Sequence, residues 1–440
     1  MKFFLLKLGC PKNDVDADYI SARLIDDGHQ LTTDPEKAHS LIINTCGFIQ
    51  AAREESINEI LKLSLLKNSG YPKTLYATGC LSQRYGIELL RGIPELDGVF
   101  GLGEIDALAR AVATSSRLVK PVFKDARRLD YLCGSRRHIA DNLPYAYLKI
   151  SDGCNRLCSF CAIPFIRGKY RSRSLKAVVD EARFLADHGK REIIIVSQEA
   201  TLYGHDLKER SNIINLLQEL EKIEKISWIR LLYLYPDRVN GELIAYMAQS
   251  RKTLKYFDLP LQHINDDILK RMRRRTSRRQ IEQLLFKIKT IIPEAVLRTT
   301  FIVGFPGESK EQFKELRTFI ETYRFDRVGV FSFSLEEGTV AAKMRPLVSE
   351  KVKNTRLDDL MTLQQEIAFA KNNSLIGTNK KVIIDSSDDS RMARGRTEDD
   401  CPDIDQEIVI HGKNLKAGDI RIVKITGANG YDLMGEVLQG

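Results

Sequence analysis

The sequence predicts an α/β protein with three successive parts: an amino-terminal parallel α/β sheet domain, a central partial (β/α)6 barrel and a carboxy-terminal small β-barrel. Three observations lead to this prediction. The 440 residues exceed what one hydrophobic core usually accommodates. Short apolar runs alternate with helix-like stretches over most of the chain, which is typical of parallel sheets. Near the end, apolar and polar residues alternate singly, as in β-strands. We therefore expect domains over residues 1–118, 144–372 and 373–440, with a linker over 119–143.

The amino-terminal domain is predicted from three apolar runs separated by amphipathic stretches. The runs are KFFLLKLG (2–9), SLIINT (40–45) and TLYATG (74–79), and the helical stretches span 15–28 and 53–68. Gly28 and Gly70 stand where these helices are expected to end. Right-handed crossovers then place the carboxyl ends of all three strands at one edge of the sheet.

A cysteine follows each of these strands directly: Cys10, Cys46 and Cys80. Open α/β sheets bind their ligands at the carboxyl edge of the strands. We therefore expect the three thiols to lie together at that edge, although 36 and 34 positions separate them along the chain.

Six further apolar runs predict the strands of the central barrel. They span residues 145–151, 192–198, 228–234, 256–262, 296–304 and 327–334. Amphipathic stretches such as 175–189 and 278–292 fill the gaps, and a long helix over about 350–374 leads out of the barrel. Six β/α units fall short of the eight that close a complete barrel, so we expect a partial one.

The end of the chain is predicted to form a small five-stranded barrel. KKVIID, QEIVIHG, DIRIVKITGA and YDLMGEVL alternate in polarity between Gly and Asp turns. This tail carries nine Lys and Arg against twelve Asp and Glu, a net charge of −3, whereas the first 372 residues carry +12. A basic body often approaches nucleic acid and an acidic module suits a basic partner, but solubility alone also explains so mild an imbalance.

The stretch SDGCNRLCSFCAIP (151–164) places three more cysteines within eight positions: Cys154, Cys158 and Cys161. They follow the first barrel strand, so their loop is expected on the catalytic rim. A zinc site needs a fourth ligand, and the nearest histidines are His138 and His188. An iron–sulfur cluster held by three thiolates keeps one iron open for a substrate or cofactor, and we favour it over zinc.

The composition points to the cytoplasm and to no membrane association. No run approaches the roughly eighteen apolar residues of a membrane span. Lys7 interrupts the apolar start of the chain and no small-residue cleavage site follows, so we expect no signal peptide. In a reducing compartment, eight cysteines are expected to serve metal or redox chemistry rather than disulfides.

The segment CNRLCSFCAIP fits the CxxxCxxC signature of radical S-adenosylmethionine enzymes. With the three strand-end cysteines and the small β tail, which is called a TRAM domain in this family, the whole chain resembles a methylthiotransferase. Three further stretches resemble the RimO type within that family: GCPKN (9–13), CAIPFIRGKYRSR (161–173) and YDLMG (431–435). Met434 stands where that type usually carries Trp.

The resemblance implies methylthiolation of the β-carbon of an aspartate in the small-subunit ribosomal protein number twelve, in two S-adenosylmethionine-dependent steps. It implies two 4Fe-4S clusters and S-adenosylmethionine as cofactors. Two cysteine sets are implied as metal ligands: Cys154, Cys158 and Cys161 for one cluster, and Cys10, Cys46 and Cys80 for the other. The implied partners are that ribosomal protein, free or on the ribosomal subunit, and a reductant such as flavodoxin or ferredoxin.

Five further residues are predicted to contact S-adenosylmethionine: Phe160, Gln198, Glu199, Arg298 and Gly304. Phe160 adjoins a cluster cysteine and is implied to lie near the adenine, with a plain core aromatic as the alternative. Gln198 and Glu199 end the second barrel strand, where a solvated loop is the alternative. Gly304 ends the fifth strand and permits close backbone approach, although such a glycine also suits a simple turn. Arg298 is a candidate partner for the cofactor carboxylate.

Several residues have no assigned role. His263 is either a residue near the substrate or a structural one, and Cys133 and Cys401 have no partner at a ligand spacing. The segment KRMRRRTSRR (270–279) has seven basic residues among ten, which suits ribosomal RNA phosphates, the cofactor carboxylate or a solvated helix start.

Two other functions fit the same features. One keeps the chemistry and changes the substrate to a modified adenosine in transfer RNA. The other is an iron–sulfur or zinc-holding RNA-binding adaptor without catalysis. The acidic tail favours a basic protein substrate, because RNA would repel it.

Overall fold

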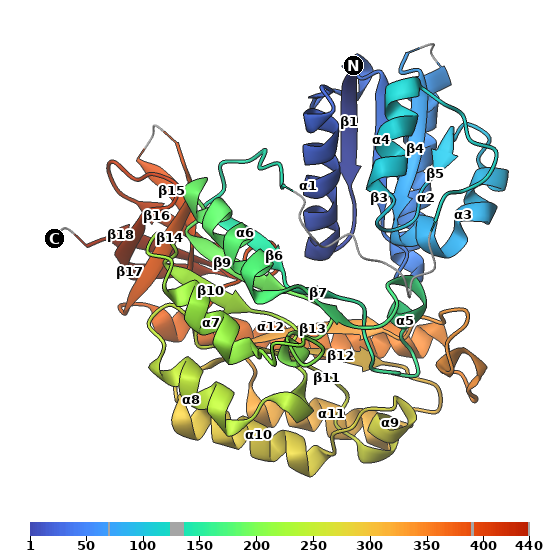
Figure 1. The fold of residues 1–440 in the computed structure, drawn as a ribbon. Coiled ribbons are helices and arrows are strands. Elements are labelled where there is room, and N and C mark those ends of the chain that lie inside the picture. Colours follow the sequence, from blue (N-terminus) through green and yellow to red (C-terminus); the bar gives the residue numbers. More distant parts are fainter. Residues whose placement is uncertain (69–70, 124–135, 389–390, 439–440) are drawn as a thin grey trace. The chain divides into compact units, whose positions relative to one another are not determined.

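The computed structural model describes residues 1–68, 71–123, 136–388 and 391–438 (Figure 1). The chain forms two compact units. The first comprises Met1–Ala140, Lys149–Arg173 and Ser334–Ala342, and the second comprises Asp141–Leu148, Ser174–Phe333 and Lys343–Gly440. Cys133 lies outside the described residues.

The first unit is built on a parallel five-stranded sheet in the order β2-β1-β3-β4-β5. Its strands are β1 (Lys2–Lys7), β2 (Gln30–Leu31), β3 (Ser40–Thr45), β4 (Thr74–Gly79) and β5 (Gly98–Val99). Its helices are α1 (Pro11–Asp26), α2 (Gln50–Asn68), α3 (Cys80–Gly92) and α4 (Ile105–Thr114). The three long strands lie where the apolar runs predict them. The edge strands β2 and β5 have two residues each, too few for a recognisable pattern.

Both faces of this sheet are covered, which explains why every residue of β3 and β4 is buried and why their sequences are mostly apolar. Leu41 and Ile43 of β3 pack with residues of α2 and α3 on one face. Ile42, between them, packs with residues of α1 and α4 on the other face. Because consecutive side chains of a strand point to opposite faces, one run SLIINT contributes to both halves of the core.

The first unit also contains the loop that carries the second cysteine set. This loop includes β7 (Ser151–Asp152), which pairs antiparallel with β8 (Arg171–Ser172), and the short helix α5 (Ile163–Ile166). Ala162 and Ile166 are buried in one cluster with Cys80 and Leu102. The loop therefore packs on α3, the helix that begins at Cys80.

The second unit contains the six predicted barrel strands, in two parallel sheets ordered β10-β9-β6 and β11-β12-β13. They are β6 (Tyr145–Lys149), β9 (Glu192–Val196), β10 (Trp228–Leu231), β11 (Tyr256–Gln262), β12 (Val296–Val303) and β13 (Arg327–Ser332). The helices are α6 (Leu175–Asp187), α7 (Ile213–Glu221), α8 (Gly241–Gln249), α9 (Asp266–Arg271), α10 (Arg278–Ile291), α11 (Lys310–Tyr323) and α12 (Glu350–Leu375). The partial barrel predicted from the sequence is confirmed.

Each helix of the second unit begins at a Ser or Asn side chain that accepts a hydrogen bond from the first turn. These N-caps are Ser174, Asn212, Asn240, Asn265, Ser277, Ser309 and Ser349. Such caps satisfy backbone N–H groups that have no partner within the helix, so they fix where each helix starts. Among the described residues, no helix combines the length and hydrophobicity that a membrane crossing requires.

The tail folds into a closed five-stranded barrel in the order β14-β15-β16-β18-β17, as predicted. Its strands are β14 (Asn379–Ser387), β15 (Met392–Thr397), β16 (Ile408–His411), β17 (Ile420–Asn429) and β18 (Asp432–Val437). The sequence MARGRT of β15 does not read as a strand. Arg396 in it is almost fully buried, because carboxylates replace the water around its guanidinium.

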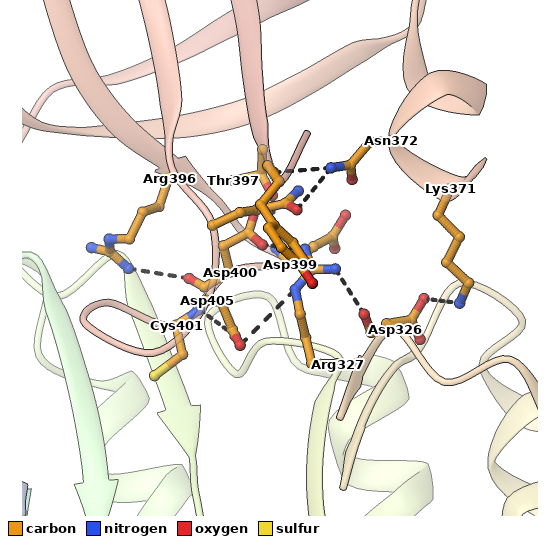
Figure 2. Close-up of polar contacts among 12 residues, drawn as sticks. Asp326, Arg327, Lys371, Asn372, Arg396, Thr397, Asp399, Asp400, Cys401 and Asp405 are labelled. Atoms are coloured by element: carbon orange, nitrogen blue, oxygen red, sulfur yellow. Dashed lines mark hydrogen bonds and ion pairs between the residues drawn. The ribbon is translucent and has the colours of Figure 1, made fainter. Parts of the chain in front are cut away.

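Ion pairs and hydrogen bonds join this small barrel to the β/α barrel within the second unit (Figure 2). Arg396 lies 2.7 Å from Glu192 of β9, and Arg327 of β13 binds Asp400. The hydroxyl of Tyr256 donates to Asp405 at 2.6 Å. Part of the tail's negative charge, which the sequence suggests is available to a basic partner, is therefore bound inside the unit.

Candidate functional site

Cys10, Cys46 and Cys80 come together at the carboxyl edge of the five-stranded sheet. Cys10 precedes α1, Cys46 follows β3 and Cys80 begins α3. Gly9 shows how closely the chain approaches itself here: its φ is +95°, and a Cβ at this position would lie 3.0 Å from the Sγ atom of Cys46. The thiols of Cys10 and Cys46 both influence the pKa of Cys80. The three thiols therefore lie close together, as the sequence predicts.

Burial governs the acidity of this trio. Burial raises the pKa of the Cys80 thiol to about 12, and the guanidinium of Arg167 counteracts this rise. Burial also raises the pKa of Cys46. A buried thiol keeps its proton unless a metal takes its place, so metal binding at this edge releases protons.

The donor set of this edge suits an iron–sulfur cluster. Three sulfur atoms are soft ligands and disfavour magnesium or manganese. Among the described residues, no three His, Cys, Asp or Glu side chains converge to hold a single metal ion. Each thiolate of a cluster binds a different iron, so its ligands need not converge on one point. The residues present therefore fit a cluster.

The loop of Cys154, Cys158 and Cys161 is shaped by close backbone contacts. Gly153 has φ +77°, and a Cβ there would lie 2.2 Å from the carbonyl oxygen of Lys169. The Cys154 N–H donates to Gly168 O at 3.0 Å, and the Cys161 N–H donates to Cys158 O at 3.2 Å. These bonds curl the chain so that the three cysteines share one loop.

The three cysteines of this loop differ in their exposure. Cys154 is buried, whereas Cys158, Cys161 and the adjoining Phe160 are half-buried. The soft, all-sulfur donors of this loop fit a cluster as the first trio does.

Arg167, one residue beyond α5, is a site residue that the sequence does not single out. It is 1% exposed, and its guanidinium binds Asp152, Asn13 and Asp16. Asp152 stands two residues before Cys154, and Asn13 stands three residues after Cys10. Arg167 belongs to the motif CAIPFIRGKYRSR, but nothing in a sequence indicates that a charged residue is buried.

Gln198 and Glu199 follow β9 in the second unit and differ in their contacts. Both polar atoms of the Gln198 amide are buried and have no hydrogen-bond partner among the described residues. An amide in that state costs free energy unless a ligand binds it. Glu199 is fully buried, with Oε1 3.2 Å from Nε of Arg238. The Gln198 amide is therefore available to bind a ligand, whereas the Glu199 carboxylate already pairs with Arg238.

Gly304 and Arg298 lie at opposite ends of β12. Gly304 follows the strand, and its N–H donates to Glu308 at 2.6 Å. A Cβ at Gly304 would lie 2.3 Å from Cγ of Lys353, so the close approach is to a side chain of α12. Arg298, near the start of the strand, binds Asp258 at 2.9 Å. Their contacts are internal, and their part in cofactor binding stays a prediction.

His263 follows β11 and is fully buried. The Asn265 N–H donates to its Nδ1 at 3.0 Å, and Nε2 has no partner in the described part of the chain. Burial, reinforced by Arg356, lowers the pKa of His263 to about 3, so the ring is neutral at physiological pH. Since Nδ1 accepts, the proton sits on Nε2.

The basic segment 270–279 is partly internal. Arg274 is buried, stacks on the ring of Tyr235 at 3.9 Å and donates to Pro260 O. Lys270, Arg273, Arg275 and Arg279 are exposed, so the segment is solvated in part.

Three family descriptions match consecutive parts of the chain. They are the uncharacterized protein family UPF0004 over residues 2–101, the radical SAM superfamily over residues 148–320 and the TRAM domain over residues 376–438. Among solved structures, the radical S-adenosylmethionine methyltransferase TsrM from Kitasatospora setae, solved with cobalamin and a [4Fe-4S] cluster, matches with a TM-score of 0.55 at 17% identity. That match covers 75% of this chain and 74% of TsrM, and it supports the fold.

Curated relatives match nearly the whole chain. The ribosomal protein uS12 methylthiotransferase RimO of Acetivibrio thermocellus is 42% identical over 99% of this chain and 98% of its own. The protein of the same name from Caldanaerobacter subterraneus is 44% identical over 98% of this chain and 99% of its own. With such similarity across all three parts, this chain belongs to the RimO family of radical S-adenosylmethionine methylthiotransferases.

Proposed function

We propose that this enzyme adds a methylthio group to the β-carbon of an aspartate in ribosomal protein uS12. The relatives that match over nearly the full length carry that ribosomal protein in their names. The observation that carries the proposal is that two sets of three cysteines belong to the same compact unit. Three thiolates leave one iron of a 4Fe-4S cluster without a protein ligand.

Two 4Fe-4S clusters and S-adenosylmethionine fit these residues. Cys154, Cys158 and Cys161 would hold the cluster that binds S-adenosylmethionine, and Cys10, Cys46 and Cys80 would hold the second. When bound, these groups supply the one-electron chemistry that breaks an unactivated C–H bond. They also supply the sulfur that replaces the hydrogen. No side chain deprotonates such a carbon at neutral pH, so acid–base groups alone are insufficient.

The chain's own residues contribute placement and exclusion of water. Cys46, Cys80 and Cys154 are buried, which keeps solvent from half of the six proposed ligand cysteines. Gln198 offers S-adenosylmethionine an amide donor and acceptor that have no partner among the described residues. Phe160, Glu199, Arg298 and Gly304 complete the proposed cofactor contacts.

The proposed setting is the cytoplasm, with a small reductant such as flavodoxin or ferredoxin as electron donor. Cysteines that serve metal chemistry rather than disulfides suit a reducing compartment. The substrate is uS12, either free or on the ribosomal subunit.

The test compares cells with and without this chain by mass spectrometry of uS12 and of transfer RNA. Loss of an increment of about 46 Da, the mass of an added SCH₂, from uS12 supports the proposal. Loss of that increment from a transfer RNA adenosine instead, with uS12 unchanged, assigns the enzyme to the RNA substrate. No change in either refutes both.

A further inference from the structure

A buried network of four charged side chains joins the segments that carry the two cysteine sets. Its cations are Arg167 and Lys149, and its carboxylates belong to Asp16 and Asp152. All four residues are at most 5% exposed. In a medium of low polarity such charges persist only because they neutralise one another.

The network fixes the position of each segment through hydrogen bonds. Arg167 places Nη1 at 2.9 Å from Asp152, and Asp152 also accepts the N–H of Gly153 at 2.8 Å. Its other nitrogen, Nη2, lies 2.7 Å from the side-chain oxygen of Asn13 and 3.0 Å from Asp16. One guanidinium thus binds the residues that flank Cys154 and those that follow Cys10.

Arg167 also faces the first cysteine trio. The thiol of Cys80 lies 3.7 Å from the same Asn13 oxygen that Arg167 binds. The guanidinium of Arg167 lies within hydrogen-bonding reach of the Cys80 side chain, and its charge also acts on Cys46. Lys149 also pairs with the carboxylates of Asp16 and Asp152.

We propose that Arg167 is a positioning residue that sets the reduction potential of the cluster held by Cys10, Cys46 and Cys80 while it anchors the Cys154 loop beside that cluster. This inference rests on the proposed function, because it presupposes a cluster at that trio. The potential of an iron–sulfur cluster depends on nearby charge and on hydrogen bonds to its sulfurs. A cation at the thiolates favours the more negative, reduced state, and its effect weakens with distance.

The experiment isolates the cluster in the full chain with Cys154, Cys158 and Cys161 replaced by Ala. After anaerobic reconstitution, the midpoint potential is measured by dithionite titration followed by electron paramagnetic resonance. We expect Arg167→Met to shift it to more negative values than Lys149→Met does. Lys149→Met is the matched control, because it removes one positive charge from the same two carboxylates.

Asp152→Asn tests the opposite sign with little change of shape. It removes a negative charge that neutralises Arg167, so the midpoint potential should shift to more positive values. If Arg167→Met does not fold, this variant alone tests whether Arg167 sets the potential. Equal shifts for Arg167→Met and Lys149→Met, or an unchanged or more negative potential for Asp152→Asn, overturn the inference alone. A background chain without about four irons overturns the proposed function, and this inference with it.

Discussion

Arg84 and Glu336 lie 252 positions apart in the chain, yet Nη1 of Arg84 is 2.7 Å from Oε2 of Glu336. Arg53 binds the same carboxylate, whose side chain is 2% exposed. Arg53 belongs to α2, after Cys46, and Arg84 belongs to α3, which begins at Cys80. Glu336 thus holds both helices that follow the buried cysteines of the sheet edge.

Replacing Glu336 with Gln should lower the free energy of unfolding by about 3–5 kcal/mol, because two arginines lose the carboxylate that neutralises them in a buried site. Urea denaturation followed by circular dichroism measures this. The control is Glu337→Gln, an exposed side chain that should change stability by less than about 0.5 kcal/mol. Equal effects of the two substitutions would contradict the role given to Glu336.

The two cysteine sets should separate the two halves of the reaction. Replacing Cys154, Cys158 and Cys161 with Ala should abolish release of 5′-deoxyadenosine while about four irons remain. Replacing Cys10, Cys46 and Cys80 should leave that release intact and stop sulfur transfer. Iron analysis and liquid chromatography of the products check both expectations. If the variant without Cys10, Cys46 and Cys80 keeps all its iron, these cysteines do not hold a cluster.

Gln198→Leu should have opposite effects on stability and on binding. Without ligand, the variant should gain about 1–3 kcal/mol of unfolding free energy, since it removes a buried amide that none of the described residues binds. Its dissociation constant for S-adenosylmethionine should rise about tenfold, the equivalent of one lost hydrogen bond. Calorimetry on the reconstituted protein checks both, with the exposed Gln218→Leu as control. A variant that binds as tightly as the wild type excludes Gln198 from the cofactor site.

His263 should make the protein less stable in acid. Its pKa is about 3 in the folded chain against an ordinary value of 6.5, so below pH 6.5 the unfolded state binds a proton that the folded state does not. The unfolding free energy should therefore fall by about 1.4 kcal/mol per pH unit from this residue alone, down to the folded pKa. In His263→Gln this contribution disappears. Parallel stability curves for both proteins between about pH 5.5 and 4.5 would refute the assignment.

Arg396→Met should uncouple the small barrel from the β/α barrel. The substitution removes the cation of the half-buried Asp385 carboxylate and leaves the buried Glu192 carboxylate paired with Arg230 alone, at a cost of about 3–5 kcal/mol. Arg394, two residues earlier in β15, pairs with Glu407 at the surface, and Arg394→Met should cost at most about 1 kcal/mol. Scanning calorimetry should show an earlier or divided transition only for Arg396→Met, and identical scans would contradict this interface.

Much of the fold and part of the site followed from local pattern. Strands such as SLIINT are apolar because both faces of the sheet are covered, so they are visible in the sequence. The position of a cysteine directly after such a strand fixes the edge at which it emerges, and Cys10, Cys46 and Cys80 therefore meet where the sequence predicted. The cysteine spacing in the second loop likewise needs no long-range information.

Only the tertiary structure decided which charged residues are buried. Arg167, Glu336 and Arg396 have the same local appearance as the solvated arginines and glutamates around them. Their burial depends on partners far away in the chain, such as Asp16, Arg84 and Glu192. A charge enters a protein interior only where opposite charges and hydrogen bonds replace its water, and that replacement is a property of the assembled fold rather than of any segment.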